Sequence, residues 1–246
     1  AGYVRLDVRH AGSAAQYPPV RPDPPIVVVA ARNEHDRIGA ALSALAGAFP
    51  GASVWVADDA STDSTPEIAM SVGARVVSRG RPHGKGANVT AAAQAALGDE
   101  VADATPVVLC DADLGASAGR LAPLVDAVRR GECDLAVASF ARTVGGGLGI
   151  AVGFARWAVE RRCGMRMTAP LSGQRAMRAE VLRGLLPLAP GFGLETGMDI
   201  DAVRAGHRVR EIELDLEHRA TGRTPDGFVH RARQLRDIVR VYRSRR

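Results

Sequence analysis

Short apolar runs alternate with helical patterns over the first 140 residues, and this alternation constrains the fold more than any other feature. The runs end in polar turns and are too short for free-standing helices, so they are typical of buried strands. They lie at 26–30, 53–57, 74–78 and 107–110. Helical patterns separate them, around 38–45, at 66–72 and at 87–97. Strict alternation of strand and helix predicts an α/β fold with a doubly wound, mostly parallel sheet.

The rest of the chain continues in the same style and shows no linker to a second domain. It predicts helices at 119–130, 150–162, 179–186, 195–205 and 231–243, with strands at 134–139 and 208–214. Residues 1–25 are rich in Pro, Gly and Ala and predict an extended or disordered arm. We therefore expect a single domain over 26–246. Its first part, 26–114, would bind a nucleotide, and 115–246 would bind the second substrate and end in a basic helix.

Charge and composition limit the classes of partner that we expect for this chain. The net charge is +5, and the last 28 residues contain nine Arg and two acids. A basic end suits phosphorylated substrates or an anionic surface. Aromatic residues make up only 4% of the chain, without the basic interleaving that stacks bases, so we expect no nucleic acid partner. The three cysteines form no CxxC pair, no apolar run is long enough to span a bilayer, and no signal peptide is visible. These features predict a cytoplasmic protein. Peripheral membrane contact through the basic helix and a homodimer both stay open.

Two carboxylates follow the fourth apolar run directly. Asp111 and Asp113 stand at the end of a predicted strand, where open α/β folds bind their ligands. Mg²⁺ is commonly held by one or two carboxylates together with phosphate oxygens. The pattern predicts a metal–diphosphate site, although a strand that simply ends in solvated Asp residues would look the same.

Polar residues also follow the other predicted strands. Glu34 follows the first strand, Asp58 and Asp59 the second, and Lys85 stands in the loop after the third. Each alone is ordinary turn chemistry. Because the carboxyl ends of parallel strands share one edge of the sheet, we expect these groups to face one crevice.

Together these motifs resemble a known family. Residues 27–34 (VVVAARNE), 58–63 (DDASTD), 84–86 (GKG) and 111–113 (DAD) look like the nucleotide-sugar half of GT-A fold glycosyltransferases, including those of family 2. Residues 170–176 (PLSGQRA), 189–197 (APGFGLETG) and 217–219 (EHR) are similar to glucosyl-3-phosphoglycerate synthases and their mannosyl relatives. The resemblance covers about residues 26–240.

The resemblance implies a role for each matching residue. Glu34 and Asp59 would hold the uridine, Lys85 would reach the nucleotide and Asp111 would touch the ribose. Ala31 and Gly173 would complete the nucleotide-sugar site.

The resemblance also implies the catalytic and metal residues. Asp113 and His218 would bind Mg²⁺ or Mn²⁺. Glu195 would hold sugar hydroxyls, and the Leu171 carbonyl would face the sugar.

The acceptor site departs from the family pattern. The synthases carry a longer segment before the position of 170–173, whereas 161–168 is compact here. Arg166, Thr168 and Arg219 are the residues we expect to meet an acceptor.

The stereochemistry is predicted from an absence. Inverting members commonly place a Glu-Asp pair where this chain has Glu195 and Thr196, and Thr offers no base. This predicts retention. Asp199 is the alternative base if the enzyme inverts.

The predicted function is transfer of a sugar, glucose being expected, from a UDP-sugar to a small polar or anionic acceptor. One alternative is an inverting family 2 transferase that glycosylates a polyprenyl phosphate. A second is a non-catalytic nucleotide-binding protein. A nucleotidyltransferase is disfavoured because 31–35 lacks the expected glycine-rich loop.

Overall fold

The computed structural model describes residues 23–140, 149–217 and 225–245, with the backbone alone for 225–231. Within these ranges the chain forms one seven-stranded sheet of order β3-β2-β1-β4-β6-β5-β7. The strands are β1 (Ile26–Ala31), β2 (Ser53–Asp58), β3 (Arg75–Ser78), β4 (Pro106–Asp111), β5 (Leu135–Phe140), β6 (Arg175–Arg178) and β7 (Val209–Leu214). The predicted single α/β domain with a mostly parallel sheet is confirmed. The predicted arm lies almost entirely outside the described residues.

Helices connect the strands and largely follow the predicted alternation. They are α1 (Ile38–Ala48), α2 (Thr65–Ser71), α3 (Lys85–Leu97), α4 (Ala122–Arg129), α5 (Ile150–Cys163), α6 (Ala179–Leu185), α7 (Leu194–Arg204) and α8 (Pro225–Ser244), with 3-10 segments η1 (Ala112–Leu121) and η2 (Gly191–Gly193). The structure corrects two helix starts. The turn after β4 is helical from Ala112 instead of 119, and α8 begins at Pro225 instead of 231 because Pro is well tolerated in a first helical turn.

The position of β1 places a reversal of the strand order in the middle of the sheet. β1 pairs in parallel with β2 on one side and with β4 on the other, and β3 follows beyond β2. The chain therefore winds outward from β1 to β3 and then returns across β1 to β4. A reversal of this kind opens a crevice at the carboxyl ends of the two central strands.

Strand β6 was not predicted. It runs antiparallel to both of its neighbours, β4 and β5, in the middle of the sheet. Its sequence, Arg-Ala-Met-Arg, contains no β-branched residue, so its strand conformation is imposed by pairing on both sides and not by local propensity.

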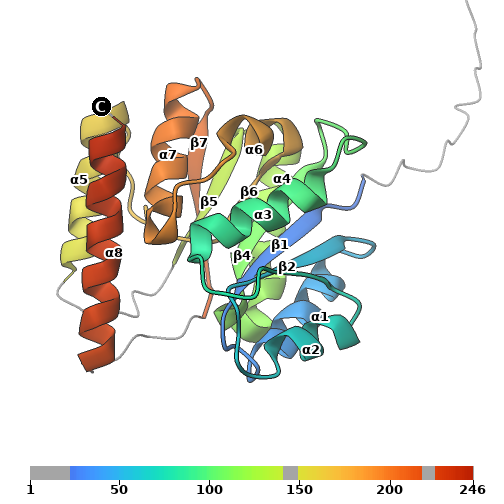
Figure 1. Ribbon diagram of the computed structural model, residues 1–246. Coiled ribbons are helices and arrows are strands. Elements are labelled where there is room, and N and C mark those ends of the chain that lie inside the picture. Colours follow the sequence, from blue (N-terminus) through green and yellow to red (C-terminus); the bar gives the residue numbers. More distant parts are fainter. Residues whose placement is uncertain (1–22, 141–148, 218–224, 246) are drawn as a thin grey trace, which may run out of the picture.

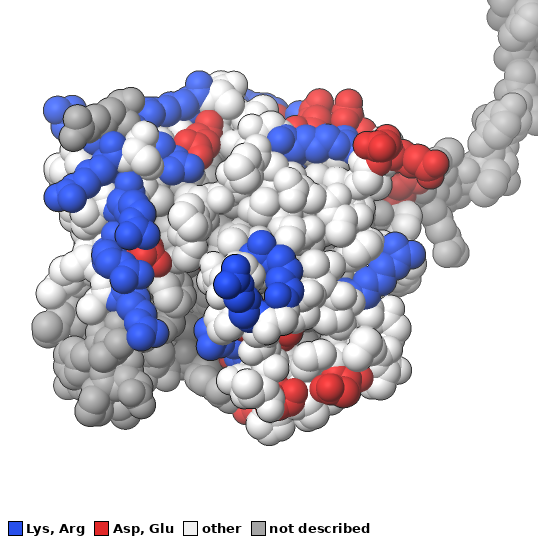
Figure 2. Space-filling view, in the orientation of Figure 1, with Lys and Arg blue, Asp and Glu red and all other residues white. Residues whose placement is uncertain are grey.

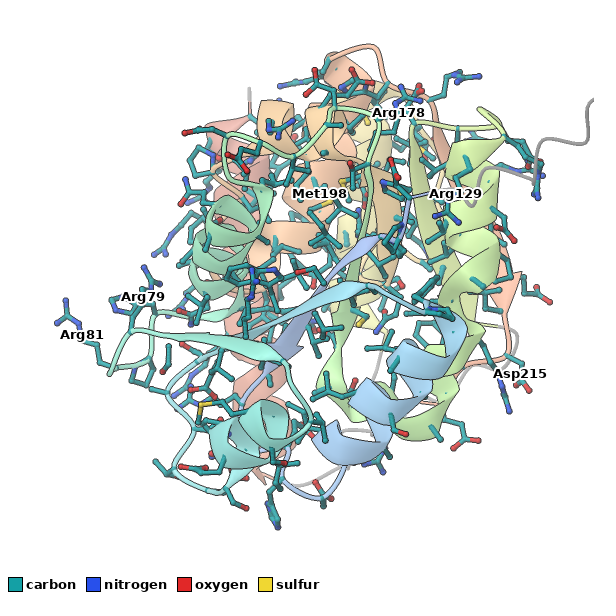
Figure 3. The ribbon with its side chains drawn as sticks, turned by 90° about the vertical axis from the view of Figure 1, so that its right-hand side faces the viewer. Arg79, Arg81, Arg129, Arg178, Met198 and Asp215 are labelled. Carbon is teal, nitrogen blue, oxygen red and sulfur yellow. The ribbon has the colours of Figure 1, made fainter. Side chains whose placement is uncertain are left out.

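The sheet is covered on both faces, which explains the continuous apolar character of its central strands. Alternate residues of β1 enter opposite cores. Val27 and Val29 pack with residues of α1, η1 and α4, whereas Ile26 and Val28 pack with residues of α3, α6 and α7. Met198 of α7 lies inside this second core (Figure 3).

Helices α5 and α8 lie side by side at the β7 end of the molecule (Figure 1). Both also contact α7, which ties them to the sheet. None of the helices that the structure describes combines the length and the apolar character needed to cross a membrane.

Candidate active site

The carboxyl ends of β1, β2 and β4 meet at one edge, as the sequence predicts. Ala31, the last residue of β1, is paired with Asp58 of β2, and Ala30 is paired with Asp111 of β4. The end of β1 is therefore flanked on both sides by carboxylates, and the loops that follow these strands lie at the same edge of the sheet.

The loops after β1 and β2 are joined to each other. The Asn33 N–H donates to Ser61 Oγ over 2.9 Å, the Thr62 N–H donates to Asn33 Oδ1 over 2.8 Å and the Glu34 N–H donates to Thr65 Oγ1 over 2.8 Å. Asn33 has a φ of 54°, in the left-handed region that Asn tolerates better than most residues. These bonds fix the position of Glu34 at the edge of the crevice.

Asp59 is buried and organises the loop before α3. One of its carboxylate oxygens accepts from the His83 N–H at 2.7 Å, from the Gly84 N–H at 3.1 Å and from the Asn88 side-chain amide. Its other oxygen lies 3.5 Å from Arg32 Nη1. Asp59 thus positions the glycine-lysine turn with one oxygen and presents the second beside a cation.

Lys85, the single lysine of the sequence, starts helix α3. Its Nζ lies 2.6 Å from Asp111 Oδ1 and 2.6 Å from Glu195 Oε1. Burial alone would lower the pKa of Lys85, but the two carboxylates raise it well above its ordinary value, so the ammonium group stays charged. The structure therefore brings together three predicted site residues from β4, α3 and α7.

The charge of this cluster fits a divalent cation. Asp113 stands two residues after Asp111, in the first turn of η1, and Arg37 Nη1 donates to its backbone carbonyl over 2.8 Å. The carboxylates of Asp111, Asp113 and Glu195 exceed the single ammonium group of Lys85 by two negative charges. Carboxylate oxygens are the donors that Mg²⁺ prefers and that Mn²⁺ also accepts.

The described side chains do not complete a metal site. Among the described residues there is no group of three or more His, Cys, Asp and Glu side chains that could hold a metal ion. His218, the predicted second ligand, lies outside the described residues, and so does the predicted acceptor residue Arg219.

The turn before β6 closes the cluster from the other side. A Cβ atom on Gly173 would lie 2.7 Å from Lys85 Nζ and closer still to the Asp111 carboxylate, so only glycine fits there. The Gln174 amide donates to Asp111 Oδ2 over 3.2 Å. Leu171 lies in the same turn, two residues from Gly173.

An ion pair that is fully buried supports this turn. The guanidinium group of Arg175 donates twice to the Asp199 carboxylate of α7, and both side chains are inaccessible to solvent. Arg175 Nε also donates to the Ser172 carbonyl over 2.9 Å. Burial raises the pKa of Asp199 to about 6 against the opposing effect of Arg175, so the carboxylate is ionised at neutral pH.

The predicted acceptor residues are already engaged. Arg166 Nε lies 2.7 Å from Glu160, and its side chain is 87% exposed. The Thr168 hydroxyl and the backbone N–H groups of Thr168 and Ala169 all donate to the Glu211 carboxylate, over distances from 2.6 to 3.0 Å. In the described part of the chain, no hydrogen bond or ion pair joins Arg166 or Thr168 to Lys85, Asp111 or Glu195.

Sequence reasoning missed Asn88, Gln174, Arg175 and Glu211 as parts of this region. The only signal in the sequence was for Gln174 and Arg175, which directly follow the glycine of the 170–176 motif. The contacts of Gln174 and Arg175 depend on β6, a strand that the sequence did not predict.

Comparison with known proteins agrees with the fold. The sheet order and the crevice at β1 and β4 define a GT-A fold of the kind that binds nucleotide sugars. The chain belongs to glycosyl transferase family 2, whose model matches residues 26–163.

Glucosyl-3-phosphoglycerate synthases are among the proteins that the chain is similar to. The chain is 32% identical over 224 residues to glucosyl-3-phosphoglycerate synthase of Mycolicibacterium paratuberculosis, across 78% of this chain and 65% of that protein. It thus spans just under two thirds of the length of this relative. A structure of the Mycobacterium tuberculosis synthase with Mn²⁺, UDP-glucose and phosphoglyceric acid matches with a TM-score of 0.71 and 28% identity, over 90% of this chain and 79% of that chain. A structure of that synthase with Mg²⁺ and UDP matches with a TM-score of 0.71 and 30% identity, over the same shares of the two chains.

Proposed function

We propose that the protein is a metal-dependent glycosyltransferase that moves glucose from UDP-glucose to a small polar or anionic acceptor, with retention. The observation that carries the proposal is the cluster of Lys85, Asp111 and Glu195 at the point where the strand order reverses, with Asp113 beside it. The similarity to synthase structures that contain UDP-glucose and Mn²⁺ supports it.

The donor site follows from the loops around β1. Glu34 and the second oxygen of Asp59 would accept hydrogen bonds from the uridine, and Asp111 would accept them from the ribose. Ala31 and Gly173 would let the backbone approach the nucleotide, since a side chain at 173 would fill the space between Lys85 and Asp111. Lys85 would offer its charged ammonium group to the diphosphate.

Asp113 and His218 would hold Mg²⁺ or Mn²⁺. When bound, the metal ion neutralises the negative charge that grows on the leaving diphosphate. Lys85 contributes to the same neutralisation from a fixed position, which costs no reorganisation during the reaction. Glu195, oriented by Lys85, would accept hydrogen bonds from the sugar hydroxyls, and the Leu171 carbonyl would face the sugar.

Retention is favoured because Asp199 and Glu195 of α7 are already paired with cationic side chains. An inverting enzyme needs a free base opposite the leaving group. Asp199 is bound twice by Arg175, and Glu195 is bound by Lys85. Thr196 has a buried hydroxyl, without a hydrogen-bond partner among the described residues, and no basic pKa to offer. The leaving diphosphate is therefore the best available proton acceptor, and attack from its own face keeps the anomeric configuration.

The acceptor would approach past Arg166, Thr168 and Arg219. An acceptor anion at Thr168 would have to displace Glu211, which occupies those donors. This competition favours acceptors that contact Thr168 through a hydroxyl group.

The first test is turnover of UDP-glucose with and without metal. Activity should need Mg²⁺ or Mn²⁺, EDTA should remove it, and Asp113→Ala should abolish it because the remaining carboxylates are held by Lys85. Asp126→Ala removes an exposed carboxylate on α4 and should leave activity unchanged. Full activity in EDTA would contradict the metal-dependent proposal. Activity on polyprenyl phosphate, with none on small soluble acceptors, would contradict the proposed acceptor class and support the polyprenyl phosphate alternative.

The second test is the configuration of the product. Proton NMR of fresh product should show the anomeric coupling of an α-linked sugar from the α-linked donor. A β-linked product would overturn retention and would require Asp199 to leave Arg175 and act as the base.

A further inference from the structure

Helix α8 presents a row of arginines to solvent. Arg233, Arg236, Arg240 and Arg243 are all exposed and recur at intervals of three and four residues, so they share one helical face. Figure 2 shows this row as a stripe of basic side chains along α8, with one acidic side chain beside it. From 232 to 245 the only acid is Asp237, which also accepts from the Phe192 N–H at 3.2 Å. The stripe is therefore strongly positive.

Apolar side chains border this stripe. Phe154 and Trp157 of α5 lie with ring centroids 6.0 and 4.8 Å from that of Tyr242 on α8, and Arg162 stacks over the Tyr242 ring at 3.8 Å. Val239 lies three residues from both Arg236 and Tyr242 and so connects the aromatic rings to the arginine row. The aromatic contacts hold α5 and α8 together as one surface.

Part of the α5 surface remains open. Ile150 is 59% exposed and Trp157 is 48% exposed, and seven residues separate them, which places both on one face of α5. Large hydrophobic side chains rarely stand this open in the described part of the chain. The other two, Met70 and Val72, lie near the end of α2.

Basic side chains beside an exposed Trp and Ile match the boundary of an anionic lipid layer. The headgroups attract arginine, and the amphipathic ring of Trp favours the interfacial region. A second copy of the chain in a symmetric dimer would bring the same patch onto itself and so set arginine against arginine. We propose that the α5–α8 face docks the protein peripherally on an anionic lipid surface. This inference does not rest on the proposed transfer reaction.

The experiment is co-sedimentation of the whole chain with vesicles. Phosphatidylcholine vesicles are compared with vesicles that also contain phosphatidylglycerol, at low and high salt. The protein should bind the anionic vesicles and not the neutral ones, and salt should weaken binding because the attraction is screened. The double variant Arg240→Gln/Arg243→Gln should bind about five-fold more weakly for each arginine removed.

A matched control removes two charges elsewhere. Arg81→Gln/Arg129→Gln changes two arginines that project from other parts of the surface (Figure 3) and should bind like the wild type. Trp157→Ala should weaken binding without changing the salt dependence, and circular dichroism should show that all variants fold.

Four results would overturn the proposal. Equal binding to both vesicle types would show that charge is not recognised. Equal losses in the two double variants would show that the α8 stripe is not the docking surface. If light scattering shows a dimer that Arg240→Gln/Arg243→Gln or Trp157→Ala disrupts, the face binds a second copy of the chain. If the protein binds an oligonucleotide and not vesicles, the face binds nucleic acid.

Discussion

Lys85 is the residue at which the proposed donor site can be tested most directly. Its ammonium group acts as a compact point charge that lies 2.6 Å from each of two carboxylates, whereas the guanidinium group of Arg would present a larger planar fork. Lys85→Ala should raise the dissociation constant for UDP by about 10- to 150-fold, because one charge-assisted contact contributes roughly 1.5–3 kcal/mol. Calorimetry in the presence of Mn²⁺ measures this. Arg81→Ala removes a cation from the same loop and should leave the affinity unchanged, and equal affinities in both variants would remove Lys85 from the site.

At this scale the sequence predicted which residues lie at this edge of the sheet better than it predicted which residues they contact. Asp111 and Lys85 were expected in one crevice because they follow predicted strand ends, and Glu195 was expected at the sugar from the family resemblance. Their mutual contact was not, because Lys85 and Glu195 are 110 residues apart and no local pattern encodes that distance. Asp59 shows the same limit, since its role in fixing the loop before α3 depends on an amide from Asn88.

At the scale of elements, β6 is the main difference between expectation and structure. A four-residue strand with Arg at both ends lacks every usual strand signal. It forms because β4 and β5 supply backbone partners on both sides and because Asp199 of α7 neutralises the buried Arg175. The longer strands were predictable because their own residues form apolar runs that are typical of buried strands.

The link between β6 and α7 can be tested by breaking the buried pair. Asp199→Asn should lower the free energy of unfolding by about 3–5 kcal/mol, because it leaves the Arg175 guanidinium buried without its counter-charge. The double variant Arg175→Met/Asp199→Leu should lose less, since no charge is then stranded. Urea denaturation measures both. A single variant as stable as the wild type would show that the pair does not hold the two elements together.

At the scale of the whole molecule, carboxylates at two distant places link the fold to pH. Hydrogen bonds from Arg208 lower the pKa of Asp134 to about 2, and these bonds connect the start of β5 to the start of β7. At the other end of the sheet, burial would raise the pKa of Asp63, but hydrogen bonds from Thr65 and His35 bring it to about 2. Asp63 thus connects the loops after β1 and β2.

The sign of the pH effect follows from these depressed values. A carboxyl group that is more acidic in the folded than in the unfolded chain stabilises the fold above its unfolded pKa, and this contribution disappears as the pH falls through its folded pKa. The contributions of Asp63 and Asp134 should therefore be complete above about pH 4 and be lost between about pH 4 and pH 2.

Asp134→Asn isolates one of these groups. The free energy of unfolding should fall by about 1 kcal/mol at neutral pH, since Arg208 is largely exposed and solvent screens part of the interaction. The wild type and the variant should then converge as the pH falls to about 2 and below, where Asp134 becomes protonated in both the folded and the unfolded wild-type chain. Urea titrations at several pH values measure the difference, with Asp126→Asn on the exposed face of α4 as the matched control. A gap between wild type and variant that stays constant down to the lowest pH would mean that Asp134 stabilises the β5–β7 end through packing and not through its charge.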